Sequence, residues 1–167
     1  MKDGNVLDVL MKGAANVMTN KLTADFYAAL AADGNIGSTS GAFGYNHIVD
    51  AIADMNVEDE SQLVLLINPA EKAIVRKDAD YKTAQLGEVI YNGMVGTIAG
   101  IPVVVSKAVP ADTGYILTKD AVTCFMKKDV EVEQEREANE RINNVYMRTA
   151  YVIAVTDATK ARKLVKA

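Results

Sequence analysis

The chain has 167 residues, half of them apolar, with 18 Lys and Arg against 22 Asp and Glu. Its length supports a core without disulfide or metal support, and its composition excludes a disordered or fibrous protein. The net charge of −4 argues against a protein whose main task is to grip nucleic acid. A lone Cys forms no internal disulfide, and the amino-terminal residues suit neither a signal peptide nor a membrane span. A soluble protein made in the cytoplasm is expected.

A long helix is predicted at the start of the chain, from about residue 5 to residue 32. Its apolar side chains recur at spacings of three and four and would line one face: Leu7, Met11, Ala14, Met18, Leu22, Phe26 and Leu30. We expect Met18 and Leu22, in the middle of this face, to be buried. Such a helix is roughly 40 Å long at about 1.5 Å per residue, which suggests a spine.

The segments that follow the helix alternate between turns and short elements. Gly34–Gly44, rich in Gly, Ser and Thr, is expected to be an exposed flexible loop, and a short amphipathic helix comes after it. The apolar run Leu63–Ile67 predicts a strand buried on both faces. Asn68 is expected to cap a third helix, because its side chain can accept from first-turn amides and Pro69 suits the first helical position.

From residue 88 onward the sequence predicts β-strands joined by turns. The turn signals are Asn92-Gly93, Ala99-Gly100 and Asp112-Thr113-Gly114. Residues 122–126 fit either a strand or a short helix. The last two strands are expected at Tyr151–Val155 and around Leu164.

The most unusual local feature is an acidic alternation, because a strand places every second side chain on the same face. The five carboxylates are Asp129, Glu131, Glu133, Glu135 and Glu137. They fit a solvated outer face, a surface that pairs with Lys and Arg of a neighbouring subunit, or a divalent-cation site. The nearby Arg136 and Arg141 favour pairing. If the row meets a neighbour, the subunit interface contains Glu131, Glu133, Glu135 and Arg136.

Three features that could carry chemistry are better explained structurally. His47 has no Cys or second His near it, and no catalytic partner is visible, so a surface or helix-start position is expected. The Gly34–Gly44 segment lacks the preceding strand and the following Lys of a phosphate-binding loop. Cys124, in an apolar run, is expected to be a small buried side chain. No catalytic residue, cofactor site or metal site is predicted.

The order of the segments is itself informative. An apolar strand runs into Asn68-Pro69 and a short helix, and the chain continues with Gly87–Gly93, Val95–Ser106, Tyr115–Ala121, Val130–Arg136 and Tyr151–Asp157. In this order the chain resembles, over nearly its whole length, the major capsid proteins of tailed bacteriophages with the Hong Kong ninety-seven type fold. The resemblance implies an α+β fold with a long spine helix and with peripheral and apical lobes.

Within a single capsid-type domain over residues 1–167, the resemblance assigns the parts of the chain to these lobes. Residues 1–34, the spine helix, and residues 121–167 would form mainly the peripheral lobe, and residues 45–120 mainly the apical lobe. Members of the family ordinarily carry an amino-terminal arm and an extended loop before the spine helix. A truncated form is therefore expected here.

The resemblance also implies a function. It implies a structural protein of a tailed bacteriophage or prophage, not an enzyme, which forms an icosahedral shell through repeated contacts with its own copies. Its location would be the virion capsid, and the host cytoplasm during assembly. A scaffolding protein and a portal are further expected partners of the full-length protein, whereas sequence-specific nucleic acid and membranes are not.

Two alternatives stay open. Bacterial encapsulating nanocompartments share this fold, and a carried cargo enzyme would favour an encapsulin-like shell protein. A small ligand-binding or hydrolytic domain could instead use the Gly34–Gly44 loop and the carboxylate row. Binding of nucleotide or divalent ions would favour that second alternative.

Overall fold

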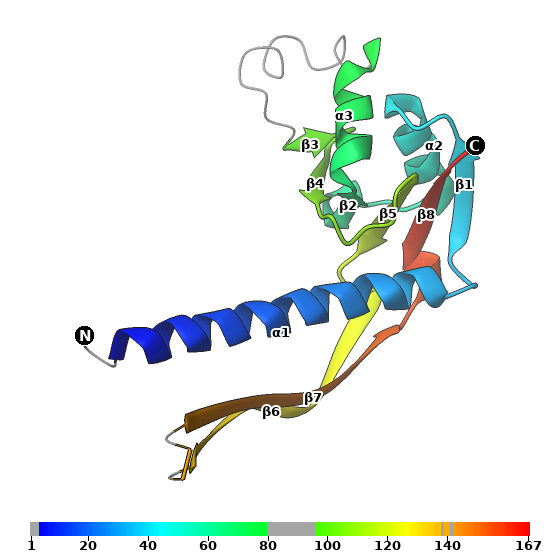
Figure 1. Cartoon of the computed structure of the whole chain (residues 1–167). Helices are drawn as coiled ribbons and strands as arrows, with labels where there is room; N and C mark the ends of the chain where they lie inside the picture. The colour runs from blue at the N-terminus through cyan, green and yellow to red at the C-terminus, as the bar shows by residue number, and fades with distance from the viewer. Residues whose placement is uncertain (1–3, 80–95, 138, 141) are drawn as a thin grey trace. The chain divides into compact units, whose positions relative to one another are not determined.

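The computed structural model describes residues 4–79, 96–137, 139–140 and 142–167 (Figure 1). It divides the chain into two compact units. The helix–hairpin unit comprises Met1–Ala29 and Thr123–Ala154, and the sheet unit comprises Leu30–Val122 and Val155–Ala167. The turn predicted at Asn92-Gly93 lies outside the described residues. None of the described helices combines the length and the apolar character that crossing a membrane requires.

The helix–hairpin unit consists of one long helix and two long strands. Helix α1 spans Gly4–Ala32, which confirms the predicted long helix. Strands β6, Val122–Glu137, and β7, Ile142–Val155, form a two-stranded sheet and run side by side in Figure 1. Residues 122–126, for which the sequence left strand or helix open, begin β6. The acidic alternation lies in the same strand, as predicted.

The sheet unit is built on six strands in the order β1-β8-β5-β2-β4-β3. Their bounds are β1 Gly37–Gly41, β2 Leu63–Ile67, β3 Thr97–Ile98, β4 Ile101–Val105, β5 Thr113–Thr118 and β8 Ala161–Lys166. β2 runs antiparallel to β5 and parallel to β4, and β8 runs antiparallel to β5 and parallel to β1. The other elements are the helices α2 Tyr45–Met55 and α3 Pro69–Lys77 and the 3-10 turns Glu60–Gln62 and Ala158–Lys160.

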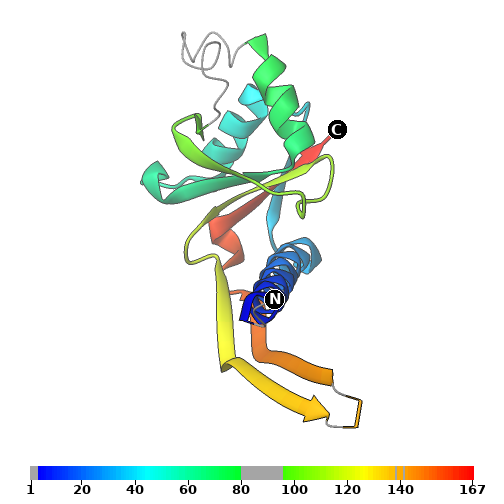
Figure 2. The ribbon, with the colours of Figure 1, turned by 60° about the vertical axis from the view of Figure 1, so that its left-hand side comes forward.

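Both helices of the sheet unit pack on the same face of the sheet, as Figure 2 shows. Leu63, Leu65 and Ile67 of β2 are completely buried and belong to one apolar cluster with Ile48 of α2 and Val75 of α3. Leu66, which alternation directs to the opposite face, is also buried. The prediction that this strand is buried on both faces is therefore confirmed.

Helix α3 begins at the predicted cap. The Asn68 side-chain oxygen accepts from the Ala70 amide at 3.1 Å, and its Nδ2 donates to the Val109 carbonyl at 2.8 Å. Pro69 occupies the first helical position. The cap therefore satisfies an amide of the first helical turn and also ties the helix to the segment between β4 and β5.

Helix α2 is capped from outside its own sequence. Its N-cap, Gly44, has no side chain to accept a hydrogen bond, and Asp78 Oδ2, just after α3, accepts from the Tyr45 amide at 2.8 Å. A Cβ atom at Gly44 would lie 2.6 Å from the same Asp78 oxygen, so glycine makes room for the cap. The start of α2 is thereby tied to the end of α3.

The expectation that Gly34–Gly44 is a flexible loop is wrong. Residues Gly37–Gly41 form strand β1, which pairs in parallel with β8 at the other end of the chain. A Cβ atom at Gly37 would overlap the Arg162 guanidinium, so glycine at this position leaves room for that side chain. A composition rich in Gly, Ser and Thr indicates that a segment is flexible by itself. It does not indicate that a distant strand, here β8, pairs with the segment.

The end of the chain also lies in the sheet unit. β8 pairs with β5 and β1, whereas the sequence grouped residues 155–167 with residues 121–154. Strand pairing over so long a sequence separation is not visible in local patterns. The assignment of the two units to a peripheral and an apical lobe stays a prediction.

A polar cluster joins α2, β1 and β8. The Thr39 hydroxyl donates to Asp54 Oδ2 at 2.7 Å and accepts from Arg162 Nε at 2.9 Å. Arg162 Nη2 also donates to Asp54 Oδ2 at 2.7 Å. The Thr39 hydroxyl and the Arg162 guanidinium therefore hold the pKa of Asp54 below its ordinary value of 3.8.

This lowered pKa predicts part of the acid sensitivity of the sheet unit. The ionised Asp54 contributes stability above its ordinary pKa, and that contribution is lost as the pH falls through the lower pKa of the folded state. In unfolding experiments from about pH 5 to about pH 2, Asp54→Asn is expected to be less stable at the upper end and to lose less stability on acidification. Asp50→Asn, an exposed position on the same helix, is the control. Parallel pH profiles for Asp54→Asn and the unaltered chain would contradict the prediction.

Candidate functional site

The carboxylate row lies on β6 with its side chains in solvent. Glu131 forms an ion pair with Lys128 at 2.6 Å, and Glu133 pairs with Arg148 of β7. All four side chains are between two fifths and three fifths exposed, so each pair contributes little to folding. No ion pair joins Glu135 to another described residue.

The predicted interface residue Arg136 does not lie on the same face of β6 as the carboxylates. Alternation places Arg136 on the opposite face of β6 from Glu131, Glu133 and Glu135. Arg141 lies outside the described residues. Within the described ranges, no group of three or more acidic, His or Cys side chains is arranged to hold a metal ion. The row is thus a charged surface with cations nearby.

The helix and the hairpin are joined by a hydrogen-bonded carboxylate. The Tyr151 hydroxyl donates to Asp25 Oδ2 at 2.7 Å, and Lys21 Nζ donates to Asp25 Oδ1 at 2.6 Å. The hydrogen bonds from Lys21 and Tyr151 lower the pKa of Asp25, and the same contact with Asp25 raises the pKa of Tyr151. These side chains fix β7 against α1. Sequence reasoning missed them because no local pattern links residues so far apart.

The face of the hairpin that meets α1 is apolar and only partly covered. One hollow of about 150 Å³ is lined by Met18, Leu22, Met126, Val130 and other side chains of this unit. A second of about 220 Å³ is lined by Leu22, Thr23, Phe26, Tyr27, Cys124 and Ile153. The helix and the hairpin therefore do not close tightly on each other.

Two expectations about burial in this unit are wrong. Leu22 is 38% exposed and Met18 is only half-buried, although both lie on the predicted apolar face of α1. Cys124, expected to be buried, is exposed. Helical periodicity identified the apolar face correctly, but it does not determine how much protein covers that face.

Exposed apolar side chains are concentrated in the helix–hairpin unit. Among the described residues, the large apolar side chains exposed in this unit are Val9, Leu10, Val17, Leu22, Phe125, Met126, Val130, Val132, Ile142, Tyr146 and Val152. Their counterparts in the sheet unit are Val49, Ile74 and Val104. Such a concentration on a minority of the chain is typical of an interaction surface.

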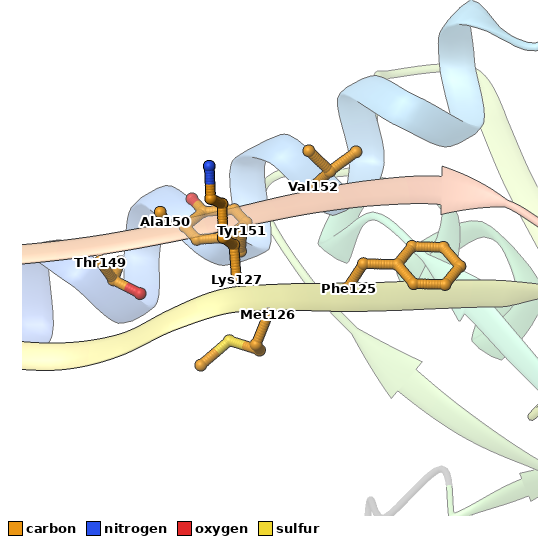
Figure 3. A pocket seen from close by; sticks show the side chains of 7 residues that line it. All are labelled: Phe125, Met126, Lys127, Thr149, Ala150, Tyr151 and Val152. Carbon is orange, nitrogen blue, oxygen red and sulfur yellow. The ribbon is translucent and has the colours of Figure 1, made fainter.

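The hairpin carries a further open hollow on its surface, of about 400 Å³. Figure 3 shows Phe125, Lys127, Ala150 and Val152 on one side of the two strands and Met126 on the other. Phe125 is 56% exposed and Val152 is 64% exposed. The sequence analysis predicted no site residue around this hollow. It considered only the carboxylates of β6 and not the apolar side chains of the same strand.

His47 has a structural position in the sheet unit. It lies in the first turn of α2 with its ring buried, and its Nε2 is 3.0 Å from the Thr39 carbonyl oxygen. The Phe43 ring packs edge-on against it, with 5.8 Å between ring centroids. The predicted helix-start position is confirmed, and the surface alternative is not. These contacts tie α2 to β1.

Comparison with known proteins gives concordant matches. A family model described as phage capsid protein matches residues 1–167. The major capsid protein of Staphylococcus phage phiMR11 is 31% identical over 125 residues, which make up 72% of this chain and 46% of that protein. The chain thus spans less than half the length of this curated relative.

Solved structures with a similar fold come from several sources. The structure described as Mycobacterium phage Che8 has a TM-score of 0.76 at 16% identity, over 95% of this chain and 62% of that one. The capsid of Cyanophage P-SCSP1u has a TM-score of 0.76 at 15% identity, over 98% and 65%. A virus-like particle from Pyrococcus furiosus has a TM-score of 0.63 at 13% identity, over 89% and 62%. At these identities the likeness establishes the fold, and it confirms the α+β class expected from the sequence.

Proposed function

The chain belongs to the phage capsid protein family, and we propose that it acts as a repeating structural subunit of a tailed-bacteriophage or prophage shell. The observation that carries this proposal is the match of the whole chain to that family. The protein would then be a component of the virion capsid and not an enzyme. Its main partners would be its own copies, with scaffolding protein and portal as additional partners during assembly.

The distribution of exposed apolar side chains supports repeated protein contacts. In the helix–hairpin unit, Leu22, Phe125 and Val152 are exposed, and few of the described side chains of this unit are fully buried. A two-stranded sheet is only marginally stable by itself, and here α1 packs on one of its faces and covers that face only in part. Burial of this surface by neighbouring subunits would contribute stabilisation that the single chain lacks.

The carboxylate row is proposed to lie at a contact between subunits. Glu131 and Glu133 already have cations on their own chain, whereas Glu135 has no ion pair with a described residue. Among these three carboxylates, Glu135 is therefore the one most available to Lys or Arg of a neighbour. Arg136, on the opposite face, would meet a different part of that neighbour or another one.

The row gives an assembly prediction. Changing Glu131, Glu133 and Glu135 together to Gln is expected to leave folding stability nearly unchanged, because each exposed pair is worth about 1 kcal/mol or less. Assembly should weaken, since many repeated contacts lose charge attraction, and the defect should shrink at high salt, which screens exposed charges. Particle yield by sedimentation at low and high salt measures both effects.

The control for the triple variant is Glu58→Gln with Glu60→Gln, two exposed carboxylates of the sheet unit. Loss of assembly in the control as well would indicate a general effect of net charge. Unaltered assembly and salt dependence in the triple variant would return the row to the role of a solvated face. Loss of a bound divalent ion would favour a metal site instead.

The overall proposal is tested by electron microscopy of the purified protein. Closed shells or capsomer-sized rings of identical subunits are the expected result. A protein that stays monomeric at every concentration and hydrolyses or binds a small ligand would contradict the proposal. Shells that enclose a cargo enzyme would instead indicate the nanocompartment alternative.

A further inference from the structure

The single histidine of the chain sits in a site that fits one form of its ring. His47 is 5% exposed, and its Nε2 lies 3.0 Å from the Thr39 carbonyl oxygen. A carbonyl oxygen only accepts hydrogen bonds, so Nε2 carries the hydrogen of the neutral ring and Nδ1 carries none. Nδ1 is buried and has no hydrogen-bond partner among the described residues. The site therefore suits the neutral ring with its hydrogen on Nε2.

The surroundings of this ring oppose a positive charge. His47 lies in the first turn of α2, where the peptide dipoles of the helix place partial positive charge. The Arg162 guanidinium of β8 donates to the hydroxyl of Thr39, the same residue whose carbonyl meets the ring. A Cβ atom at Gly41 would lie 3.2 Å from the imidazole Cδ2, so the backbone of β1 lies directly against the ring. A protonated ring would bring a second cation, and a donor without an acceptor, into this closed site.

The charged groups of the neighbouring elements are engaged elsewhere. Asp54 of α2 accepts hydrogen bonds from the side chains of β1 and β8, and Asp78, just after α3, accepts from the first amide of α2. Asp50 of α2 is exposed. On β8, Lys166 donates to Asp112 and Lys163 lies on the opposite face from Arg162. β1 has no ionisable side chain.

Strand β1 depends on the polar contacts around the ring. Its sequence, Gly37–Gly41, has no large apolar side chain, and the strand lies at an edge of the sheet, next to β8 (Figure 1). Beyond that ladder, the side-chain hydrogen bonds of β1 in the described part of the chain all involve Thr39, which meets Asp54, Arg162 and His47. The attachment of β1 to α2 therefore rests on one residue.

We propose that His47 makes this attachment sensitive to acid, so that β1 separates from α2 and frays at the sheet edge when the ring takes up a second proton. A histidine in an open or unfolded chain takes up this proton near about pH 6.5. The closed site offers the new N–H no acceptor, so acid favours the open state. The stabilising contact is thus present above about pH 6.5 and is lost as the pH falls below it. Every group in this device belongs to one chain, so it does not depend on the proposed function.

NMR of the ring nitrogens and amide hydrogen exchange test the device in the unaltered chain. A single histidine gives ring signals that need no further assignment. A proton that binds only the open state raises the population of that state about tenfold between about pH 7.5 and about pH 5.5. The hydrogen-bonded amides of β1, corrected for the intrinsic effect of pH, should exchange faster by that factor, while those of β2 keep their rates. The ring should remain neutral, because the open state stays a minority.

His47→Gln is the matched variant. Its side-chain amide can still donate to the Thr39 carbonyl but gains no charge in this pH range. Exchange of the β1 amides should therefore not change with pH in this variant. Asp50→Asn, which removes an exposed carboxylate from the same helix, is the control and should keep the tenfold rise. The contribution of Asp54 lies at lower pH and stays outside this range.

The outcomes decide the role of the histidine separately from shell formation. A ring that becomes protonated at about pH 5.5 while the β1 amides stay protected would overturn the acid-sensitive attachment. A rise in β1 exchange that persists in His47→Gln would overturn it as well, because another group would then carry the effect. If His47→Gln does not fold, the unaltered chain still decides, since β1 exchange that is constant with pH contradicts the attachment. None of these results bears on whether the chain forms shells.

Discussion

Replacing Leu65 by Ala is expected to destabilise the sheet unit by about 2–5 kcal/mol, the range for emptying a packed leucine site. Leu65 is completely buried in the middle strand β2, between β4 and β5 and beneath the two helices. Its side chain lies where neighbouring elements hold one another in place, so the cavity cannot collapse easily. Urea unfolding followed by circular dichroism measures the change.

Leu22→Ala is the contrasting control for this measurement. The sequence pattern placed Leu22 at the centre of an apolar face, but the side chain is 38% exposed beside an open hollow. We expect a loss of only about 1 kcal/mol or less, because little apolar surface leaves its packed environment. A cost of Leu22→Ala equal to that of Leu65→Ala would show that the face of α1 is covered in solution.

Replacing Glu71 by Ala is expected to cost about 2–4 kcal/mol, through an unsatisfied buried donor and an added cavity. Glu71 is 1% exposed in the first turn of α3, and its Oε1 accepts from the Asp112 amide at 2.9 Å. Asp112 adopts a left-handed backbone conformation, with φ of 58°, and its carboxylate accepts from Lys166 at 2.7 Å. The hydrogen bond to Asp112 raises the pKa of Lys166.

Glu71→Gln separates the acceptor from the charge. The amide oxygen of Gln can still accept from the Asp112 amide, so this variant is expected to lose less than half as much stability as Glu71→Ala. Equal losses in the two variants would mean that the negative charge, and not the hydrogen bond, holds this segment. Calorimetric unfolding of both variants at neutral pH decides between the two.

The sequence predicted the helix that contains Glu71, but it did not predict the buried hydrogen bond that this side chain makes. The sequence predicted α3 and its Asn68 cap, because both depend on neighbours within four positions. The hydrogen bond from Asp112 to Glu71 joins residues 41 positions apart. No local pattern encodes it, so the burial of this carboxylate was not visible before the tertiary structure.

For the candidate interface, too, the sequence predicted the local structure but not the contacts between separate segments. Strict alternation was enough to predict that β6 is a strand and that Glu131, Glu133 and Glu135 share a face. It was not enough to show that Lys128 and Arg148 already pair with Glu131 and Glu133, since Arg148 comes from the next strand. The exposed Phe125 and Val152 were missed because an apolar residue in a strand normally indicates a core.

The sequence by itself determined the α+β class, the long helix, most of the strands and the resemblance to the capsid family, because these depend on periodicity, capping and turn chemistry over short distances. Only the tertiary structure decided that Gly37–Gly41 is a strand, that residues 155–167 complete the sheet unit, and that much of the apolar face of α1 stays uncovered. Each of these depends on which distant segments meet. The apolar content of a face measures how strongly it favours burial, whereas the geometry of the whole chain, and in a shell of its neighbours, determines what buries it.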